Sequence, residues 1–228
     1  MQLKTLAAAA LLAVSSLAHA AIQVVDFGGG VATLTIDTDT TTALGGLSTS
    51  SSNTGYGFEW VLPTSVQVVS TGALQTLVVQ LPTFTLQANA GYTLNGVFSA
   101  FLGNLAYTEI GGATTGILAY ADTSLNGGLA QSSVAGVPWE SSSNGAGYNI
   151  GFFGGTKVQS FGDYQSITIS NASIVLSATG GSFSSITANS QNKLKFEFQA
   201  AAVPEPESYA LLLAGLSVVG FLARRRQR

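Results

Sequence analysis

The octapeptide ATLTIDTD at residues 32–39 alternates apolar and polar side chains. In an extended chain, Leu34 and Ile36 lie on one face and the intervening threonines on the other. The pentapeptide LKFEF at residues 194–198 repeats this pattern, with two charged side chains on the polar face. Such alternation predicts strands that bury one face and expose the other to water.

The same alternation recurs through most of the chain, and glycine or serine clusters separate the segments. Glycine suits such turns because it adopts positive φ without a steric penalty. A helical period of useful length is found only at the two ends. We therefore predict an all-β, antiparallel β-sandwich, jelly-roll-like in topology. The candidate strands are residues 22–27, 31–37, 56–62, 66–70, 77–81, 84–87, 92–101, 116–120, 148–153, 164–170, 173–178 and 194–200.

Residues 1–20 have the organisation of a secretory signal peptide. A short segment with one lysine, Lys4, precedes an Ala/Leu-rich run at 5–17 and an Ala-His-Ala sequence at 18–20. This pattern predicts cleavage by signal peptidase between Ala20 and Ala21. The remaining chain then divides into an ectodomain at 21–202 and a tail at 203–228.

Composition limits the chemistry of the ectodomain. The chain has no cysteine, and its only histidine, His19, lies in the predicted signal peptide. Disulfides, His/Cys zinc sites and Ser-His or Cys-His catalysis are thereby excluded after cleavage. No spacing places Glu59 and Glu140 across a cleft as a glycosidase pair. We expect no enzyme activity and no cofactor.

Charge limits the partners. Residues 21–203 contain nine acidic residues and three lysines, which gives a net charge of −6. So few cations cannot neutralise a row of phosphates, so we expect no binding to nucleic acid.

The last 26 residues have three successive parts. Pro204, Glu205 and Pro206 form an extended segment, because proline fixes φ and restricts the residue before it. Residues 209–223 carry no charge and are expected to form a transmembrane helix. Arg224, Arg225 and Arg226 follow and are expected to stop transfer on the cytoplasmic side. The apolar run measures only about 22 Å as a helix, against a hydrocarbon core of about 30 Å.

This tail resembles the PEP-CTERM sorting tail of exported proteins in Gram-negative bacteria. The resemblance implies recognition by exosortase and cutting near Pro204, Glu205 and Pro206, and it implies an association with exopolysaccharide and biofilm. It also implies anchoring in the inner membrane before processing, and then a location at the cell surface or in the matrix. A simple C-terminal anchor without processing is the alternative, because a helix followed by arginines is sufficient to anchor a protein.

Aromatic residues supply candidate carbohydrate contacts. Tyr56, Phe58 and Trp60 lie two residues apart and so share one face of a strand. Flat rings in a row can stack on sugars, but the interpretation that we favour for this face is a hydrophobic core. Trp139 lies in a segment that we interpret as a loop, beside Glu140, where it either contacts sugar or anchors the loop.

Asp37 and Asp39 are a weak calcium candidate, because they offer alternating carboxylates near a strand end. The EF-hand glycine and closing glutamate are missing. The other interpretation is a solvated acidic turn, with no metal.

Together these features predict an exported, non-enzymatic surface or extracellular-matrix protein that is sorted by its tail. The alternative is a carbohydrate-binding module that uses the same export route.

Overall fold

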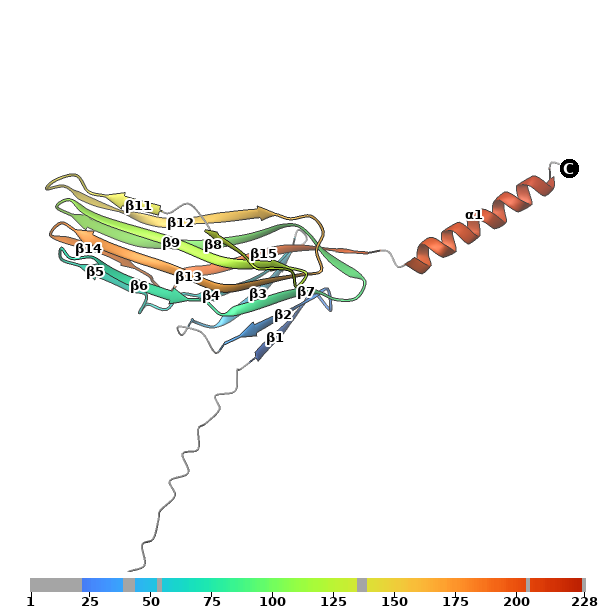
Figure 1. Ribbon diagram of the computed structural model, residues 1–228, viewed down its shortest axis with the longest axis horizontal. Coiled ribbons are helices and arrows are strands. Elements are labelled where there is room, and N and C mark those ends of the chain that lie inside the picture. Colours follow the sequence, from blue (N-terminus) through green and yellow to red (C-terminus); the bar gives the residue numbers. More distant parts are fainter. Residues whose placement is uncertain (1–21, 39–43, 53–54, 135–138, 204–205, 227–228) are drawn as a thin grey trace, which may run out of the picture.

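The alternating segments form two antiparallel sheets in the computed structural model, which describes residues 22–38, 44–52, 55–134, 139–203 and 206–226 (Figure 1). The predicted signal peptide, with Ala20 and Ala21, lies outside these residues. The elements are β1 Ile22–Phe27, β2 Ala32–Asp37, β3 Leu47–Ser52, β4 Gly55–Val61, β5 Gln67–Ser70, β6 Gln75–Gln80, β7 Thr83–Ala88, β8 Tyr92–Ile110, β9 Ala113–Leu125, β10 Gln131–Val134, β11 Trp139–Ser142, β12 Tyr148–Ser160, β13 Ser166–Gly180, β14 Phe183–Thr187, β15 Lys193–Ala202 and α1 Pro206–Arg226.

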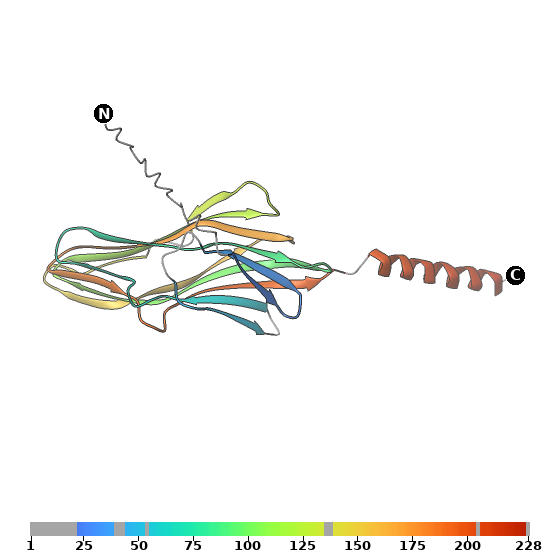
Figure 2. The same cartoon turned by 90° about the horizontal axis from the view of Figure 1, so that it is seen from below.

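Two layers make up the sandwich (Figure 2). Sheet A has eight strands in the order β1-β2-β7-β13-β9-β10, with β6 also beside β13 and β11 beside β9. Sheet B has seven strands in the order β3-β4-β15-β8-β14-β5, with β12 also beside β8. The predicted all-β, antiparallel architecture is confirmed.

Long strands give the sandwich its length, and shorter strands follow one another along their edges. In sheet A, β7 and β6 pair with successive halves of β13. In sheet B, β15 and β14 pair in the same way with β8. Pro82 lies between β6 and β7, and Pro63 between β4 and β5. A proline cannot donate a ladder hydrogen bond, so each one separates two collinear strands.

Two Gly-Gly pairs carry the chain from one sheet to the other, at the end of the sandwich away from α1 (Figure 1). Gly111 and Gly112 join β8 to β9, whereas Gly180 ends β13 and Gly181 begins the connection to β14. All four have φ between 62° and 81°, a conformation that strongly favours glycine. The turn function expected for these pairs is therefore confirmed.

An aromatic cluster lies between the sheets, within a core that also contains leucine, isoleucine and valine side chains. Phe58 of β4 packs against Phe196 of β15 in sheet B, with ring centroids 5.2 Å apart. Phe84 of β7, in sheet A, contacts both rings edge-on, at 5.2 and 5.0 Å. Offset-stacked and edge-to-face contacts of this kind add stability beyond the burial of area. The cluster is thus a direct hydrophobic contact between the two layers.

Four strands were not predicted, and one predicted division is wrong. The missed strands are β3, β10, β11 and β14. Serine clusters were expected to separate the strands, yet the serine-rich residues 47–52 form β3, which pairs with β4 at the described edge of sheet B. An edge strand whose two faces are both exposed to solvent needs no alternation of apolar and polar residues, which explains why β3 was missed. The segments 164–170 and 173–178 mostly form the single strand β13, where a bulge at Asn171 (φ 50°) interrupts the alternation.

We predict that Phe58→Ala lowers the free energy of unfolding by about 3–5 kcal/mol, because it leaves a cavity in the aromatic cluster. Phe152→Ala is the matched control, since its ring is 68% exposed. It should change stability by less than about 0.5 kcal/mol. Urea unfolding followed by tryptophan fluorescence checks both, and equal losses in the two variants would contradict this account of the core.

Candidate functional site

The C-terminal tail leaves the sandwich from an interior strand. β15 is paired on one side with β4 and on the other with β8. Its last residue, Ala202, is in register with Tyr92, and the amide of Val203 donates to the carbonyl of Gly91 at 2.8 Å. The tail is therefore held by backbone hydrogen bonds up to its first residue.

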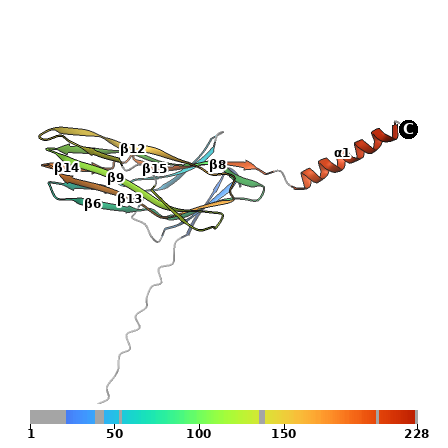
Figure 3. The ribbon, with the colours of Figure 1, turned by 45° about the horizontal axis from the view of Figure 1, so that its top comes forward.

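Helix α1 begins earlier and ends later than the expected run at 209–223, since it spans Pro206–Arg226. Proline is favoured at the first helical position, because its fixed φ suits the helix and its missing N–H would have no partner there. Figure 3 shows α1 clear of both sheets. Its apolar side chains are accordingly open, with Leu211 74% and Val219 63% exposed.

Within the described parts of the chain, no helix is both long enough and apolar enough to cross a membrane. The expected transmembrane helix is therefore not confirmed. Pro204 and Glu205 of the expected sorting motif lie outside the described residues, and Pro206 is the first residue of α1. Arg224 is exposed, whereas the side chains of Arg225 and Arg226 lie outside the described part.

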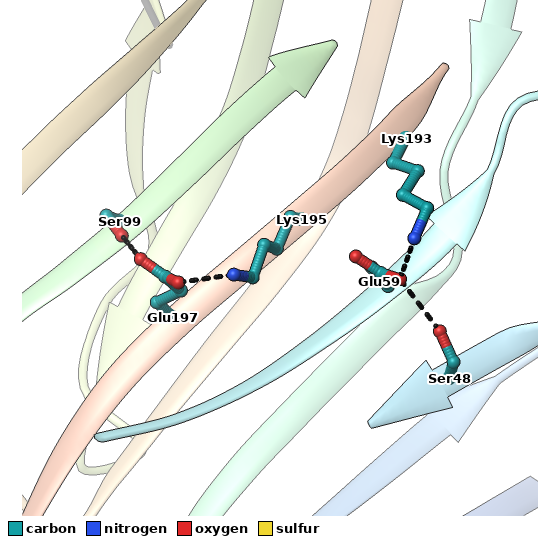
Figure 4. Close-up of polar contacts among 6 residues, drawn as sticks. All are labelled: Ser48, Glu59, Ser99, Lys193, Lys195 and Glu197. Atoms are coloured by element: carbon teal, nitrogen blue, oxygen red, sulfur yellow. Dashed lines mark hydrogen bonds and ion pairs between the residues drawn. The ribbon is translucent and has the colours of Figure 1, made fainter. Parts of the chain in front are cut away.

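Charged residues gather on the outer face of sheet B (Figure 4). Lys193 of β15 donates to Glu59 of β4 at 2.5 Å, and Ser48 of β3 donates to the same carboxylate at 3.1 Å. Along β15, Lys195 pairs with Glu197 at 2.6 Å. These contacts join three adjacent strands on the face opposite the aromatic cluster.

The Lys193 contact lowers the pKa of Glu59 below its ordinary value, chiefly through the hydrogen bond from the ammonium group. Partial burial opposes the shift, and the Ser48 hydroxyl adds to it. A hydrogen-bonded cation favours the ionised carboxylate, which explains the direction. Glu59 therefore forms a structural ion pair. Glu140, the other carboxylate considered for a glycosidase pair, belongs to β11 of the other sheet.

The expected aromatic row belongs to the core. Phe58 is fully buried and Trp60 is 4% exposed, so sugar rings cannot reach their faces. We therefore correct the carbohydrate expectation for these two residues. Tyr56 is partly buried and stacks on Phe198, with ring centroids 5.5 Å apart.

The structure describes the candidate sugar contact Trp139 and the candidate calcium site only in part. Trp139 begins β11, opposite Ile117 of β9, rather than lying in a loop, and its side chain lies outside the described part. Asp37 ends β2, opposite Thr83, whereas Asp39 lies outside the described residues. Among described residues, no group of three or more His, Cys, Asp or Glu side chains could hold a metal ion. The calcium hypothesis stays untested, because one of its two carboxylates is not described.

An exposed apolar row that the sequence did not single out lies on β12. Tyr148, Ile150 and Phe152 alternate with Asn149 and Gly151, so they share one face of this edge strand. Tyr148 is 65% exposed and Phe152 68%. The residues 148–153 had been predicted as a strand, but alternation alone does not reveal which face meets the core.

A second group missed by the sequence surrounds Glu109 of β8, a carboxylate that is fully buried. Thr115 donates to its Oε1 atom through the backbone N–H at 3.0 Å and through the hydroxyl at 2.6 Å. Ser141 and Asn149 donate to Oε2, at 3.2 and 2.8 Å. Every donor is uncharged, and four strands from both sheets supply this group. It joins the sheets at the edge where β11 and β12 lie.

Comparison with known proteins identifies the tail. A family model described as the PEP-CTERM protein-sorting motif matches residues 202–227. No curated protein and no solved structure matches the chain. The chain therefore carries a PEP-CTERM protein-sorting motif at its C-terminus, which confirms the expected resemblance. The motif supports an exported protein that exosortase processes.

We predict that Glu59→Gln lowers the free energy of unfolding at pH 7 by about 0.2–1 kcal/mol, the range of exposed ion pairs. Because the pKa of Glu59 is lowered on folding, the stabilisation is present above its ordinary pKa of 4.5 and is lost as the pH falls. Urea titrations at pH 7 and pH 3 check this. In the matched variant Lys193→Gln, the loss of stability relative to the unaltered protein should likewise be smaller at pH 3 than at pH 7. A loss that is undiminished at pH 3 would contradict the ion-pair account.

Proposed function

We propose that this chain is an exported, non-enzymatic surface or extracellular-matrix protein that its tail delivers to exosortase, in association with exopolysaccharide or biofilm. The single observation that carries the proposal is the PEP-CTERM protein-sorting motif at residues 202–227. The signal-peptide pattern at residues 1–20 supports export independently. The absence of cysteine from the sequence, and of histidine after residue 19, favours a role without catalysis.

The arrangement of the tail suits this role. The sandwich ends in a paired strand, so a folded domain is already complete where the motif begins. The Pro-Glu-Pro sequence does not continue the sheet, because proline lacks the amide needed for β pairing, and this keeps the site of cutting separate from the sandwich. Cutting there releases the sandwich without breaking any of its strands.

Helix α1 holds the protein at the inner membrane before it is cut. Its exposed leucine and valine side chains provide an apolar surface, and its basic end favours the cytoplasmic side. The uncharged run at 209–223 is shorter than a typical hydrocarbon core, so we infer that arginine side chains extend to the interface and that the bilayer thins locally.

We predict that replacing Pro204, Glu205 and Pro206 by alanine stops processing while the helix and arginines still deliver the protein to the membrane. The full-length form should then accumulate in the inner membrane of the native host. Blots of membrane and extracellular fractions measure this. Glu207→Ala is the matched control, because it removes a neighbouring acid outside the Pro-Glu-Pro sequence, and it should be processed normally.

In a second arm of the same experiment, Arg224, Arg225, Arg226 and Arg228 are replaced by glutamine. This change removes the charges that retain the end in the cytoplasm, so membrane association should be lost. If the triple-alanine protein is released as efficiently as the unaltered protein, the Pro-Glu-Pro segment acts only as a spacer. The chain would then be a plain anchored domain.

A carbohydrate-binding module is the second candidate. The exposed row on β12 favours it, because Tyr148 and Phe152 present ring surface on one face of an edge strand. Aromatic side chains provide large, rigid contact area with a polar tip in the case of tyrosine. Such a module is compatible with the first proposal, since a matrix protein can bind the polysaccharide with which it is exported.

We predict that the Tyr148→Ala, Phe152→Ala double variant loses at least about tenfold in affinity for host exopolysaccharide, which corresponds to about 1.4 kcal/mol. A pull-down on the purified polysaccharide measures the loss. Trp139→Ala tests the earlier candidate, and Val158→Ala is an exposed apolar control on the same strand. Retention of binding by the double variant, or failure of the unaltered protein to bind, would eliminate this row as a sugar contact.

A further inference from the structure

Three polar groups meet at the edge of the sandwich in a triangle. The Oε2 atom of Glu109 accepts a hydrogen bond from the Ser141 hydroxyl at 3.2 Å and from the Asn149 amide at 2.8 Å. The same amide nitrogen lies 2.9 Å from Ser141 Oγ. One carboxylate oxygen is therefore in contact with both a hydroxyl and the side-chain amide beside that hydroxyl.

This is the geometry that a general base needs to activate a hydroxyl nucleophile. Oε2 can take the proton from Ser141 Oγ and return it to the nitrogen of Asn149. The folded sheets hold the reactants together, and such positioning replaces a slow bimolecular encounter by an intramolecular step. Thr115 fixes the carboxylate through both of its donors to Oε1.

We propose that Ser141 and Asn149 join in an intramolecular ester, formed by the protein itself with Glu109 as the proton relay. Ser141 Oγ bonds to the side-chain carbonyl carbon of Asn149, and the carbon–nitrogen bond of the amide breaks. The hydroxyl proton passes through Glu109 to the nitrogen, which leaves as ammonia. No oxidant, reductant or co-reactant is needed, and Glu109 returns to its starting form.

The bond would lie where it reinforces the sandwich. Ser141 belongs to β11 at the edge of sheet A, and Asn149 belongs to β12 at the edge of sheet B. An ester between them closes the loop that joins these strands, and a covalent link restricts the unfolded chain. It supplies a cross-link between the sheets in a chain that has no cysteine. This inference is independent of the sorting tail.

Peptide mapping of the full-length protein, purified in its folded form, tests the proposal. Chymotrypsin cleaves after Tyr148, which lies between the two residues. In the unaltered protein, the fragments containing Ser141 and Asn149 should remain joined after this cleavage, and together weigh one ammonia less than their sum. Mild alkali should then separate them and leave an aspartate in place of Asn149.

Three variants decide the outcome. Ser141→Ala and Glu109→Gln should each give separate fragments of unchanged mass, whereas Ser141→Thr keeps a hydroxyl and should still link. Circular dichroism confirms that each variant is folded, and Ser141→Ala alone is decisive where Glu109→Gln fails to fold. Separate fragments of full mass in the folded, unaltered protein would overturn the proposal. So would ammonia loss from the Asn149 fragment of Ser141→Ala, because that result indicates a cyclic imide at Asn149 rather than an ester.

Discussion

The packing of aromatic side chains between the two sheets is the interaction on which the rest of the structure depends. Phe58 and Phe196 in sheet B meet Phe84 in sheet A, and no disulfide can replace this contact because the chain has no cysteine. Burial of apolar area contributes about 25 cal/mol per Å². Removal of these rings would leave the aliphatic part of the core and the polar group around Glu109 to join the sheets.

The same strand that completes this core also leads to the tail. Phe196 and Phe198 of β15 are buried, whereas Lys193 and Lys195 alternate with them on the outer face. After Val203 the chain leaves the sheet, and α1 exposes its apolar side chains. The folded domain and the sorting tail therefore meet at one sharp boundary, so the tail can be cut without loss of a core strand.

The sequence allowed the architecture to be predicted where burial is one-sided. Strand β2 alternates strictly, because one face packs in the core and the other faces water. Strand β3 was not predicted because its serines do not pack against the core. It is a strand because of its hydrogen bonds to β4. The tail was recognised because its motif, apolar run and basic end are contiguous.

The polar group around Glu109 could not be predicted from the sequence, because its members come from four strands. The alternation of apolar and polar residues does not specify which strands pair. The row of Tyr56, Phe58 and Trp60 was ambiguous for a related reason, because a shared face can be either core or surface.

The central claim is that the sandwich is an export cargo whose tail is removed beyond its last strand. The most direct measurement is the mass of the C-terminal peptide of the protein recovered from outside the native host. We predict that this peptide ends within or next to residues 203–206, before the body of α1. An extracellular protein that retains its sequence through Arg228 would contradict the account.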